Sequence, residues 1–259
     1  MNTNTLKKKL KRREITIGSW ITLGNTAIAE IMAKSGFEWL VVDMEHSVIT
    51  LDIAQQLIQV IEGCGVTPLV RVGENDATVI KRVMDAGAYG VIVPMVNTKK
   101  QAEAAINAVK YPPVGTRGVG LARAQGYGNN FEEYRGWVHK DSIVIVQIEH
   151  IEAINNLEEI LCVSGVDGSI IGPYDLSASL GYPGEFDKPE LKHSLKKYQD
   201  VCNSLKMPAG FHVVPPDAGL VNDKIREGFS LLGFSLDTIF LNAGIKISLD
   251  SIKKRKQNN

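Results

Sequence analysis

The chain has 259 residues, 44% of them hydrophobic, which is enough for a sizeable core and about the length of one (β/α)8 barrel. It carries 29 Lys and Arg against 29 Asp and Glu, so its formal net charge is zero. This balance gives no indication of nucleic acid or an anionic membrane as a partner. No apolar run is long enough to cross a bilayer.

The cysteines and the N-terminal segment indicate a cytoplasmic protein. Cys64, Cys162 and Cys202 are widely spaced and lack metal-ligand spacing, so we expect reduced and mostly buried thiols. The basic run Leu6–Arg13 lacks the apolar segment of a secretion signal. We interpret it as a solvated first helix, with an anion-binding helix as the alternative.

The sequence then alternates between strand-like and helix-like segments. The predicted strands are Thr16–Thr22, the start of Trp39–Ser47, Thr67–Gly73, Gly90–Val96, Ser142–Glu149, Gly168 to about Gly172, Ala209–Val214 and Thr238–Gly244. The predicted helices are Thr26–Gly36, Leu51–Gly65, Asn75–Gly87, Thr98–Tyr111, Ala153–Val163, Glu190–Lys206, Pro215–Gly228 and Lys246–Gln257. Stop signals such as Gly36 and Pro112 bound several of them.

Eight such repeats predict a parallel sheet closed into a (β/α)8 TIM barrel, forming a single domain over residues 1–259. A doubly wound open sheet is the alternative, although neither a G-x-G-x-x-G nor a Walker A loop is present. Residues 112–141 interrupt the rhythm with glycines, prolines and the arginines Arg117 and Arg123. A loop of this length is usually functional, and we expect its FEEYRGWVH part to form a short helix.

The barrel hypothesis selects the residues that follow each strand, because barrel active sites lie at the carboxyl ends of the strands. Charged side chains are not needed for core packing there. The selected residues are Trp20, Thr22, Asp43, Glu45, His46, Arg71, Pro94, Met95, Gln147, Glu149, Gly172, Pro173, Tyr174, Asp175, His212 and Asn242.

Glu149 and Asp175 follow neighbouring predicted strands, so both carboxylates can point at one spot. Two like charges side by side are unfavourable unless a proton or cation lies between them. Mg²⁺ and Mn²⁺ accept a few carboxylates together with water and substrate oxygens. A metal site is therefore one reading of this pair, while a helix cap and a salt bridge are the structural alternatives.

Arg71 and His46 complete a plausible catalytic set. The planar guanidinium of Arg71 suits a substrate carboxylate, and His46 titrates near neutral pH, as a general base requires. Asp43 is placed to orient the His46 ring. No Lys follows a predicted strand, which argues against a Schiff base, and Ser47 lacks a G-x-S-x-G context. These parts suit metal-assisted chemistry on the enolate of a 2-oxo acid.

The chain resembles the HpcH/HpaI aldolases, metal-dependent class II pyruvate aldolases of the 4-hydroxy-2-oxo-heptanedioate and 2-dehydro-3-deoxy-sugar-acid type. The resemblance rests on GSWITLGN, FEWLVVDMEHS, PLVRVGEND, MDAGAYGVIVPMV, YPPVGTRGVGLARA, VQIE and IIGPYDLSASLG, in this order along nearly the whole chain. It implies reversible cleavage of a 4-hydroxy-2-oxo acid to pyruvate and an aldehyde through a metal-stabilised enolate.

The resemblance also implies roles for particular residues. His46 would be the base, Asp43 would orient it and Arg71 would hold pyruvate. Glu149 and Asp175 would bind Mg²⁺, Mn²⁺ or Co²⁺. Asp85 would come from a neighbouring subunit of a homohexamer, a trimer of dimers that exchanges its C-terminal helix. The substrate would further meet Trp20, Gln147, Gly172, Pro173, Tyr174 and, at the aldehyde end, Arg123.

Two positions depart from the family pattern. Tyr174 stands where many relatives have a small residue, so its ring would narrow the pocket or reach outward, and Met44 replaces a glycine. Both departures affect the expected specificity more than the expected activity. Two alternatives stay open: a citrate-lyase-like lyase acting on an acyl-CoA ester, and a non-catalytic binding protein that kept the fold.

Overall fold

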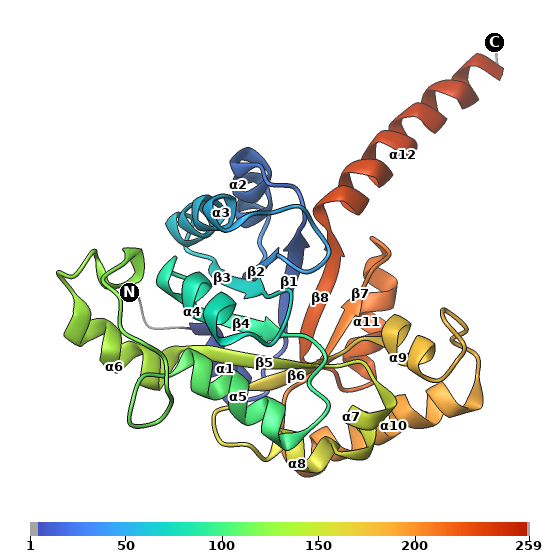
Figure 1. Ribbon diagram of the computed structural model, residues 1–259. Helices are drawn as coiled ribbons and strands as arrows, with labels where there is room; N and C mark the ends of the chain where they lie inside the picture. The colour runs from blue at the N-terminus through green and yellow to red at the C-terminus, as the bar shows by residue number, and fades with distance from the viewer. Residues whose placement is uncertain (1–4, 258–259) are drawn as a thin grey trace.

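A computed structural model describes residues 5–257 and shows eight parallel strands closed into a barrel (Figure 1). Each strand pairs with the next in the sequence, and the last strand pairs with the first. The strands are β1 (Thr16–Ile21), β2 (Trp39–Asp43), β3 (Thr67–Arg71), β4 (Gly90–Val93), β5 (Ile143–Ile148), β6 (Gly168–Ile171), β7 (Ala209–Val213) and β8 (Leu231–Leu236). The predicted TIM barrel is confirmed.

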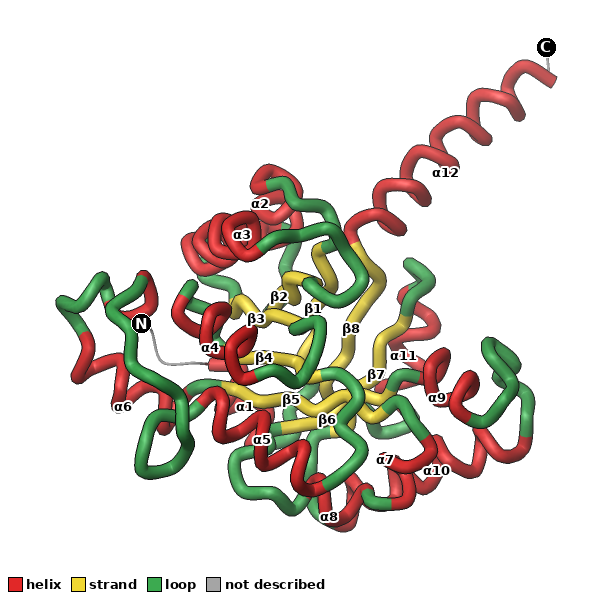
Figure 2. The backbone as a smooth tube through the Cα atoms, in the orientation of Figure 1, coloured by secondary structure: helices red, strands yellow, loops and turns green. Residues whose placement is uncertain are grey.

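Helices surround the barrel (Figure 2). They are α1 (Thr5–Lys11), α2 (Thr26–Lys34), α3 (Leu51–Gly63), α4 (Ala77–Asp85), α5 (Lys99–Val109), α6 (Phe131–Asp141), α7 (Ile151–Asn155), α8 (Leu157–Leu161), α9 (Pro173–Ser179), α10 (Pro189–Ser204), α11 (Ala218–Arg226) and α12 (Asp237–Gln257), with a short 3-10 turn, η1 (Arg123–Gln125). Among residues 5–257, no helix is long and apolar enough to span a membrane.

Burial of both strand faces explains the continuous apolar runs in the sequence. In β2, Trp39 and Val41 pack inside the barrel, whereas Leu40 and Val42 pack outward against the helices. Every residue of β2 and of β5 is buried. A parallel strand covered on both sides needs apolar side chains at every position, so the usual alternation is lost.

Helix α1 closes one end of the barrel. Leu6 and Leu10 join the interior cluster beside residues that begin strands, such as Trp39 and Ile143. Lys7 is buried and donates to Asp167 and to the Ser142 carbonyl, each at 2.7 Å. The expectation of a solvated first helix is therefore wrong for its inner face. The opposite end, where the strands finish, is left for the site.

The eighth strand lies earlier than predicted. The segment Thr238–Gly244 begins α12, and the strand is Leu231–Leu236, paired with Thr16–Trp20 of β1. Gly233 and Ser235 interrupt the run of apolar residues by which a buried strand is predicted from sequence. Gly233 is needed because a Cβ there would overlap the Trp20 ring. Asn242 is consequently not at a strand exit.

The long loop before α6 is anchored by a buried arginine. Arg117 lies over the rings of Tyr111 and Tyr134, with its guanidinium carbon 4.8 and 5.5 Å from their centroids, and it pairs with Asp85. The predicted short helix is α6. The three cysteines are free, but Cys162 is exposed, so burial holds only for Cys202 and in part for Cys64.

The glycine at position 18 tests the packing of the barrel interior. A Cβ there would overlap the Trp39 ring, so we expect Gly18→Ala to lower the free energy of unfolding by about 1–3 kcal/mol. Gly136→Ala, in the middle of α6 with open space around it, should raise stability by about 0.5–1 kcal/mol. Urea unfolding of both variants measures this contrast, and equal effects would contradict the packing described.

Candidate active site

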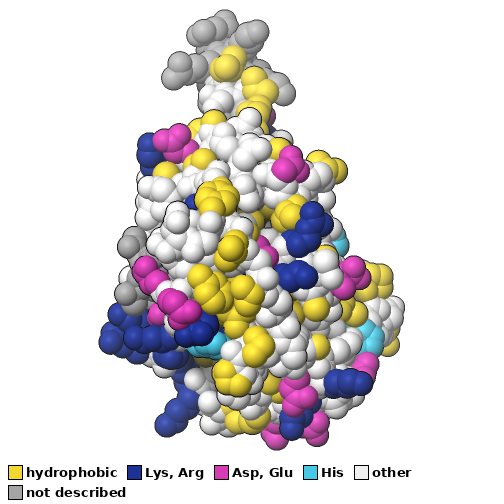
Figure 3. Space-filling model, turned by 60° about the vertical axis from the view of Figure 1, so that its left-hand side comes forward, with side chains coloured by type: hydrophobic (Ala, Val, Ile, Leu, Met, Phe, Trp, Pro, Cys, Tyr) yellow, Lys and Arg dark blue, Asp and Glu magenta, His cyan; other side chains and the backbone are white. Residues whose placement is uncertain are grey.

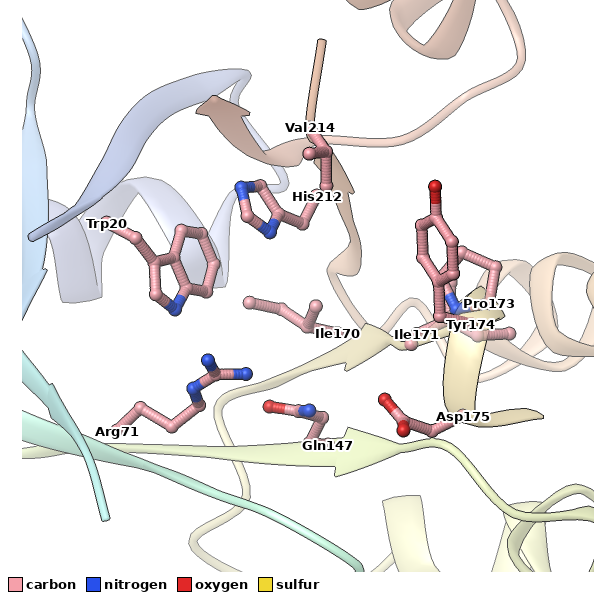
Figure 4. A pocket seen from close by; sticks show the side chains of 11 residues that line it. Trp20, Arg71, Gln147, Ile170, Ile171, Pro173, Tyr174, Asp175, His212 and Val214 are labelled. Atoms are coloured by element: carbon pink, nitrogen blue, oxygen red, sulfur yellow. The ribbon is translucent and has the colours of Figure 1, made fainter. Parts of the chain in front are cut away.

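A small pocket opens at the carboxyl ends of the strands, with a volume of about 100 Å³ (Figure 4). It receives residues from β1, β3, β5, β6 and β7 and from the start of α9. Its lining residues are Trp20, Arg71, Gln147, Ile170, Ile171, Gly172, Pro173, Tyr174, Asp175, His212 and Val214. Seven of the residues expected to bind substrate or metal are thus brought together by the barrel: Trp20, Arg71, Gln147, Gly172, Pro173, Tyr174 and Asp175.

Arg71 is held in place by Asp43. The two residues are register partners at the ends of β2 and β3. Arg71 Nε and Nη2 donate to the two oxygens of Asp43 at 2.9 and 2.6 Å, a bidentate arrangement that fixes the plane of the guanidinium. Asp43 Oδ1 also accepts the backbone N–H groups of Glu45 and His46, at 3.0 and 3.2 Å. The Asp43 side chain therefore binds Arg71 and the backbone of His46.

Glu45 is the carboxylate beside the His46 ring. Its Oε2 lies 3.8 Å from His46 Nε2 and 3.3 Å from Arg71 Nη1. Burial raises the pKa of Glu45 to about 7, opposed by the charge of Arg71. The His46 side chain is 66% exposed and lies at the mouth of the site. The sequence analysis selected Glu45 only as a residue that follows a strand, whereas the structure places it between His46 and Arg71.

Glu149 and Asp175 converge over Gly172. A Cβ built on Gly172 would lie 3.1 Å from Glu149 Oε2 and 3.8 Å from Asp175 Oδ2, so both carboxylates border one small space that the absent side chain leaves open. Glu149 is buried, accepts the Met95 N–H at 2.7 Å and is hydrogen-bonded to Gln147. Burial is the main cause that raises its pKa, and the charge of Asp175 adds to the effect.

His212 and Trp20 form the opposite wall. Their rings are stacked at 4.2 Å between centroids, and His212 Nε2 lies 2.9 Å from the Ser235 carbonyl. Burial lowers the pKa of His212 to about 4, so the ring is neutral at physiological pH. Sequence reasoning placed His212 at a strand exit but gave it no role. Its position after the apolar start of β7 was the available signal.

Tyr174 reaches outward at the rim. Its ring is 56% exposed and packs edge-on against Phe186 at 4.8 Å (Figure 4 shows the phenol pointing away from Asp175). Met44 packs against the outer core, and its N–H extends the β2–β3 pairing by donating to the Arg71 carbonyl at 2.9 Å. Of the two alternatives for Tyr174, the structure shows the outward one.

Arg123 and Asp85 lie outside this pocket. Arg123 is paired with Glu62 of α3 and donates to the Ala86 carbonyl at 3.1 Å. Asp85 ends α4 and is held by Arg117. Both therefore lie among the helices around the barrel and are not among the residues that line this chain's own pocket.

A closed (β/α)8 barrel with a pocket at the carboxyl ends of its strands, lined by Arg71, Asp175 and His212 among others, is the arrangement of a TIM-barrel enzyme. The sequence model of the HpcH/HpaI aldolase/citrate lyase family matches residues 16–239. The 2-keto-3-deoxy-L-rhamnonate aldolase of Escherichia coli O17:K52:H18 (strain UMN026 / ExPEC) is 36% identical over 256 residues, which cover 98% of this chain and 95% of that relative.

Solved structures agree with this match. An HpcH/HpaI aldolase/citrate lyase family protein from Burkholderia cenocepacia J2315 superposes with a TM-score of 0.92 at 28% identity, covering 97% of this chain and all of that one. An HpcH/HpaI aldolase from Desulfitobacterium hafniense DCB-2 gives a TM-score of 0.88 at 29% identity, covering 97% of each chain. The chain belongs to the HpcH/HpaI aldolase/citrate lyase family, and it is an aldolase, a carbon–carbon lyase.

The raised pKa of Glu45 predicts a pH-dependent stability. In the unfolded chain the carboxyl titrates near 4.5 and in the folded one near 7, so folding favours the protonated form. As pH rises from about 4.5 to about 7, the Tm of the wild type should fall by about 2–4 °C relative to that of Glu45→Gln. Above pH 7 the difference between the two Tm values should stay constant. Thermal unfolding in EDTA measures the difference, and a Tm gap that is already constant from pH about 4.5 to about 7 would contradict the shift.

Proposed function

We propose that this aldolase cleaves, reversibly, a 2-keto-3-deoxy sugar acid, that is a 4-hydroxy-2-oxo acid, into pyruvate and an aldehyde. The observation that carries the proposal is the pair Glu149 and Asp175, whose carboxylate oxygens both lie within 3.8 Å of the Cβ position at Gly172, while Asp175 and Arg71 line one pocket of about 100 Å³. The substrate class follows from the relative of 36% identity, which is named for a keto-deoxy sugar acid.

The donor set fits a hard divalent cation. Among the described residues no group of three His, Cys, Asp or Glu side chains could hold a metal, so Glu149 and Asp175 would supply the two protein carboxylates. Mg²⁺, Mn²⁺ and Co²⁺ can complete such a shell with water and substrate oxygens. The cation would polarise the 2-oxo carbonyl of the substrate. It would also offset the mutual repulsion of two carboxylates that share one small space.

The other pocket residues have complementary tasks. Arg71, held flat by Asp43, would bind the substrate carboxylate and stabilise the negative charge that develops on the enolate. The backbone of Gly172, Pro173 and Tyr174 and the side chains of Gln147 and Trp20 would border the pyruvate half.

His46 would move the proton. It would take the proton from the C4 hydroxyl as the C3–C4 bond breaks, leaving the aldehyde and the pyruvate enolate. A proton returned from the imidazolium to C3 would then give pyruvate and regenerate the neutral base. Glu45, 3.8 Å from the His46 ring, would balance the positive charge of the protonated imidazole. Asp43 would act indirectly, through the backbone of His46 and through Arg71.

Activity measurements test the metal-dependent cleavage. We expect Mn²⁺-loaded enzyme to release pyruvate from a panel of 2-keto-3-deoxy acids in an assay coupled to lactate dehydrogenase, and EDTA to remove the activity. Glu149→Gln should lower kcat/KM by about 100-fold or more, since a ligand is lost. Glu159→Gln, an exposed carboxylate on α8, is the matched control and should leave it unchanged. Full activity in EDTA would contradict the proposal.

We further propose that the chain forms a homo-oligomer, with the hexamer as the expected form. Helix α12 projects away from the barrel (Figure 1), and Figure 3 shows hydrophobic side chains on it. Leu241, Ile245, Leu249 and Ile252 are each 52% exposed and lie three or four residues apart, so they form one apolar stripe. A neighbouring copy would cover this stripe. Asp85 and Arg123, remote from their own pocket, could meet a substrate only in such a neighbour.

Light scattering tests the assembly. Ile245→Asp with Leu249→Asp should reduce the oligomer to smaller species, because charges cannot be buried in an apolar interface at low cost. Replacing Ser248 and Asp250 of the same helix by Ala provides the control. A monomeric wild type, or an unchanged mass for the doubly charged variant, would contradict the role of α12.

A further inference from the structure

His212 is fixed in one orientation and one tautomer. Its ring is stacked on Trp20, and Gly233 packs beneath both rings, with a Cβ position 3.1 Å from His212 Cδ2. The Ser235 carbonyl, 2.9 Å from Nε2, can only accept a hydrogen bond, so Nε2 carries the proton. Ser235 has a φ of 52°, which is unusual for a residue with a side chain, at the irregular end of β8.

This arrangement leaves Nδ1 as an acceptor at the pocket. Because the pKa of His212 is lowered to about 4, Nδ1 keeps its lone pair at neutral pH and cannot serve as a donor. Figure 4 shows the ring projecting into the pocket beside Trp20, on the far side from Asp175 and Gln147. A substrate held by its 2-oxo acid end at Arg71, Glu149 and Asp175 would extend toward this wall.

We propose that His212 determines specificity by accepting a hydrogen bond at Nδ1 from a hydroxyl group on the aldehyde half of the substrate. It would thereby select 2-hydroxyaldehydes over their deoxy analogues. A buried acceptor that loses its partner is costly, so an aldehyde without the hydroxyl is disfavoured. This inference rests on the proposed aldol reaction and adds the residue that recognises the acceptor.

The test uses the addition of pyruvate to lactaldehyde and to propanal, which differ by one hydroxyl, with the Mn²⁺-loaded full-length enzyme. We expect His212→Leu to lower the ratio of kcat/KM for lactaldehyde over propanal about tenfold, with propanal changed less than about twofold. His212→Asn, whose side-chain carbonyl can still accept, should retain part of the preference. Comparing ratios between variants removes the intrinsic reactivity difference of the two aldehydes.

The Ser235 carbonyl also accepts from Ser19 Oγ at 3.1 Å, so the His212 variants do not leave it without a partner. Exchange of the pyruvate methyl protons with D₂O reports the enolate chemistry separately. Normal exchange in His212→Leu with an unchanged lactaldehyde-to-propanal ratio, or an equal loss for both aldehydes, would overturn the role of His212 alone. A wild type that neither exchanges protons nor joins either aldehyde would overturn the proposed aldol reaction together with it.

Discussion

The electrostatic conflict between Glu149 and Asp175 governs the rest of the site. Both carboxylates border the space over Gly172, and Glu149 is buried there with its pKa raised by desolvation and by its neighbour. The Met95 N–H donates to Glu149 Oε1 and the Gln147 amide to Glu149 Oε2, so each oxygen of the buried carboxylate has a hydrogen-bond donor. The repulsion between the two carboxylates is a cost that a bound cation would offset, which is why we read this pair as a ligand set.

A second charge cluster faces the first across the pocket. Asp43 orients Arg71, Arg71 lies next to Glu45, and Glu45 lies beside His46, so Glu45 connects the guanidinium to the exposed imidazole. The polar side chains of the site come from different parts of the barrel: Glu149 follows β5 and Asp175 lies in α9 after β6, Asp43 and Arg71 end β2 and β3, and His212 of β7 stacks on Trp20 of β1. Barrel closure alone brings these elements to one end.

The fold could be predicted from the sequence because strand and helix patterns alternate so regularly, and the pocket residues followed from the strand ends. The predicted position of the eighth strand is wrong because Gly233 and Ser235 interrupt its run of apolar residues. Both residues contact the rings inside the barrel: Gly233 leaves room for Trp20, and the Ser235 carbonyl pairs with His212. The pairing of Asp43 with Arg71 could not be read from the adjacent letters DMEH, since it depends on the register between β2 and β3. The outward ring of Tyr174 likewise depends on Phe186, twelve residues along the chain.

The most direct test of the central claim is calorimetric titration of the metal-free protein with Mn²⁺. The account predicts a single site per chain in the wild type and an affinity at least about 100-fold weaker in Asp175→Asn, with Asp200→Asn, an exposed carboxylate on α10, binding normally. Gly172→Ala, whose Cβ would enter the space between the carboxylates, should weaken binding as well. Equal Mn²⁺ affinity in the wild type, Asp175→Asn and Gly172→Ala would contradict the assignment of Glu149 and Asp175 as the ligands.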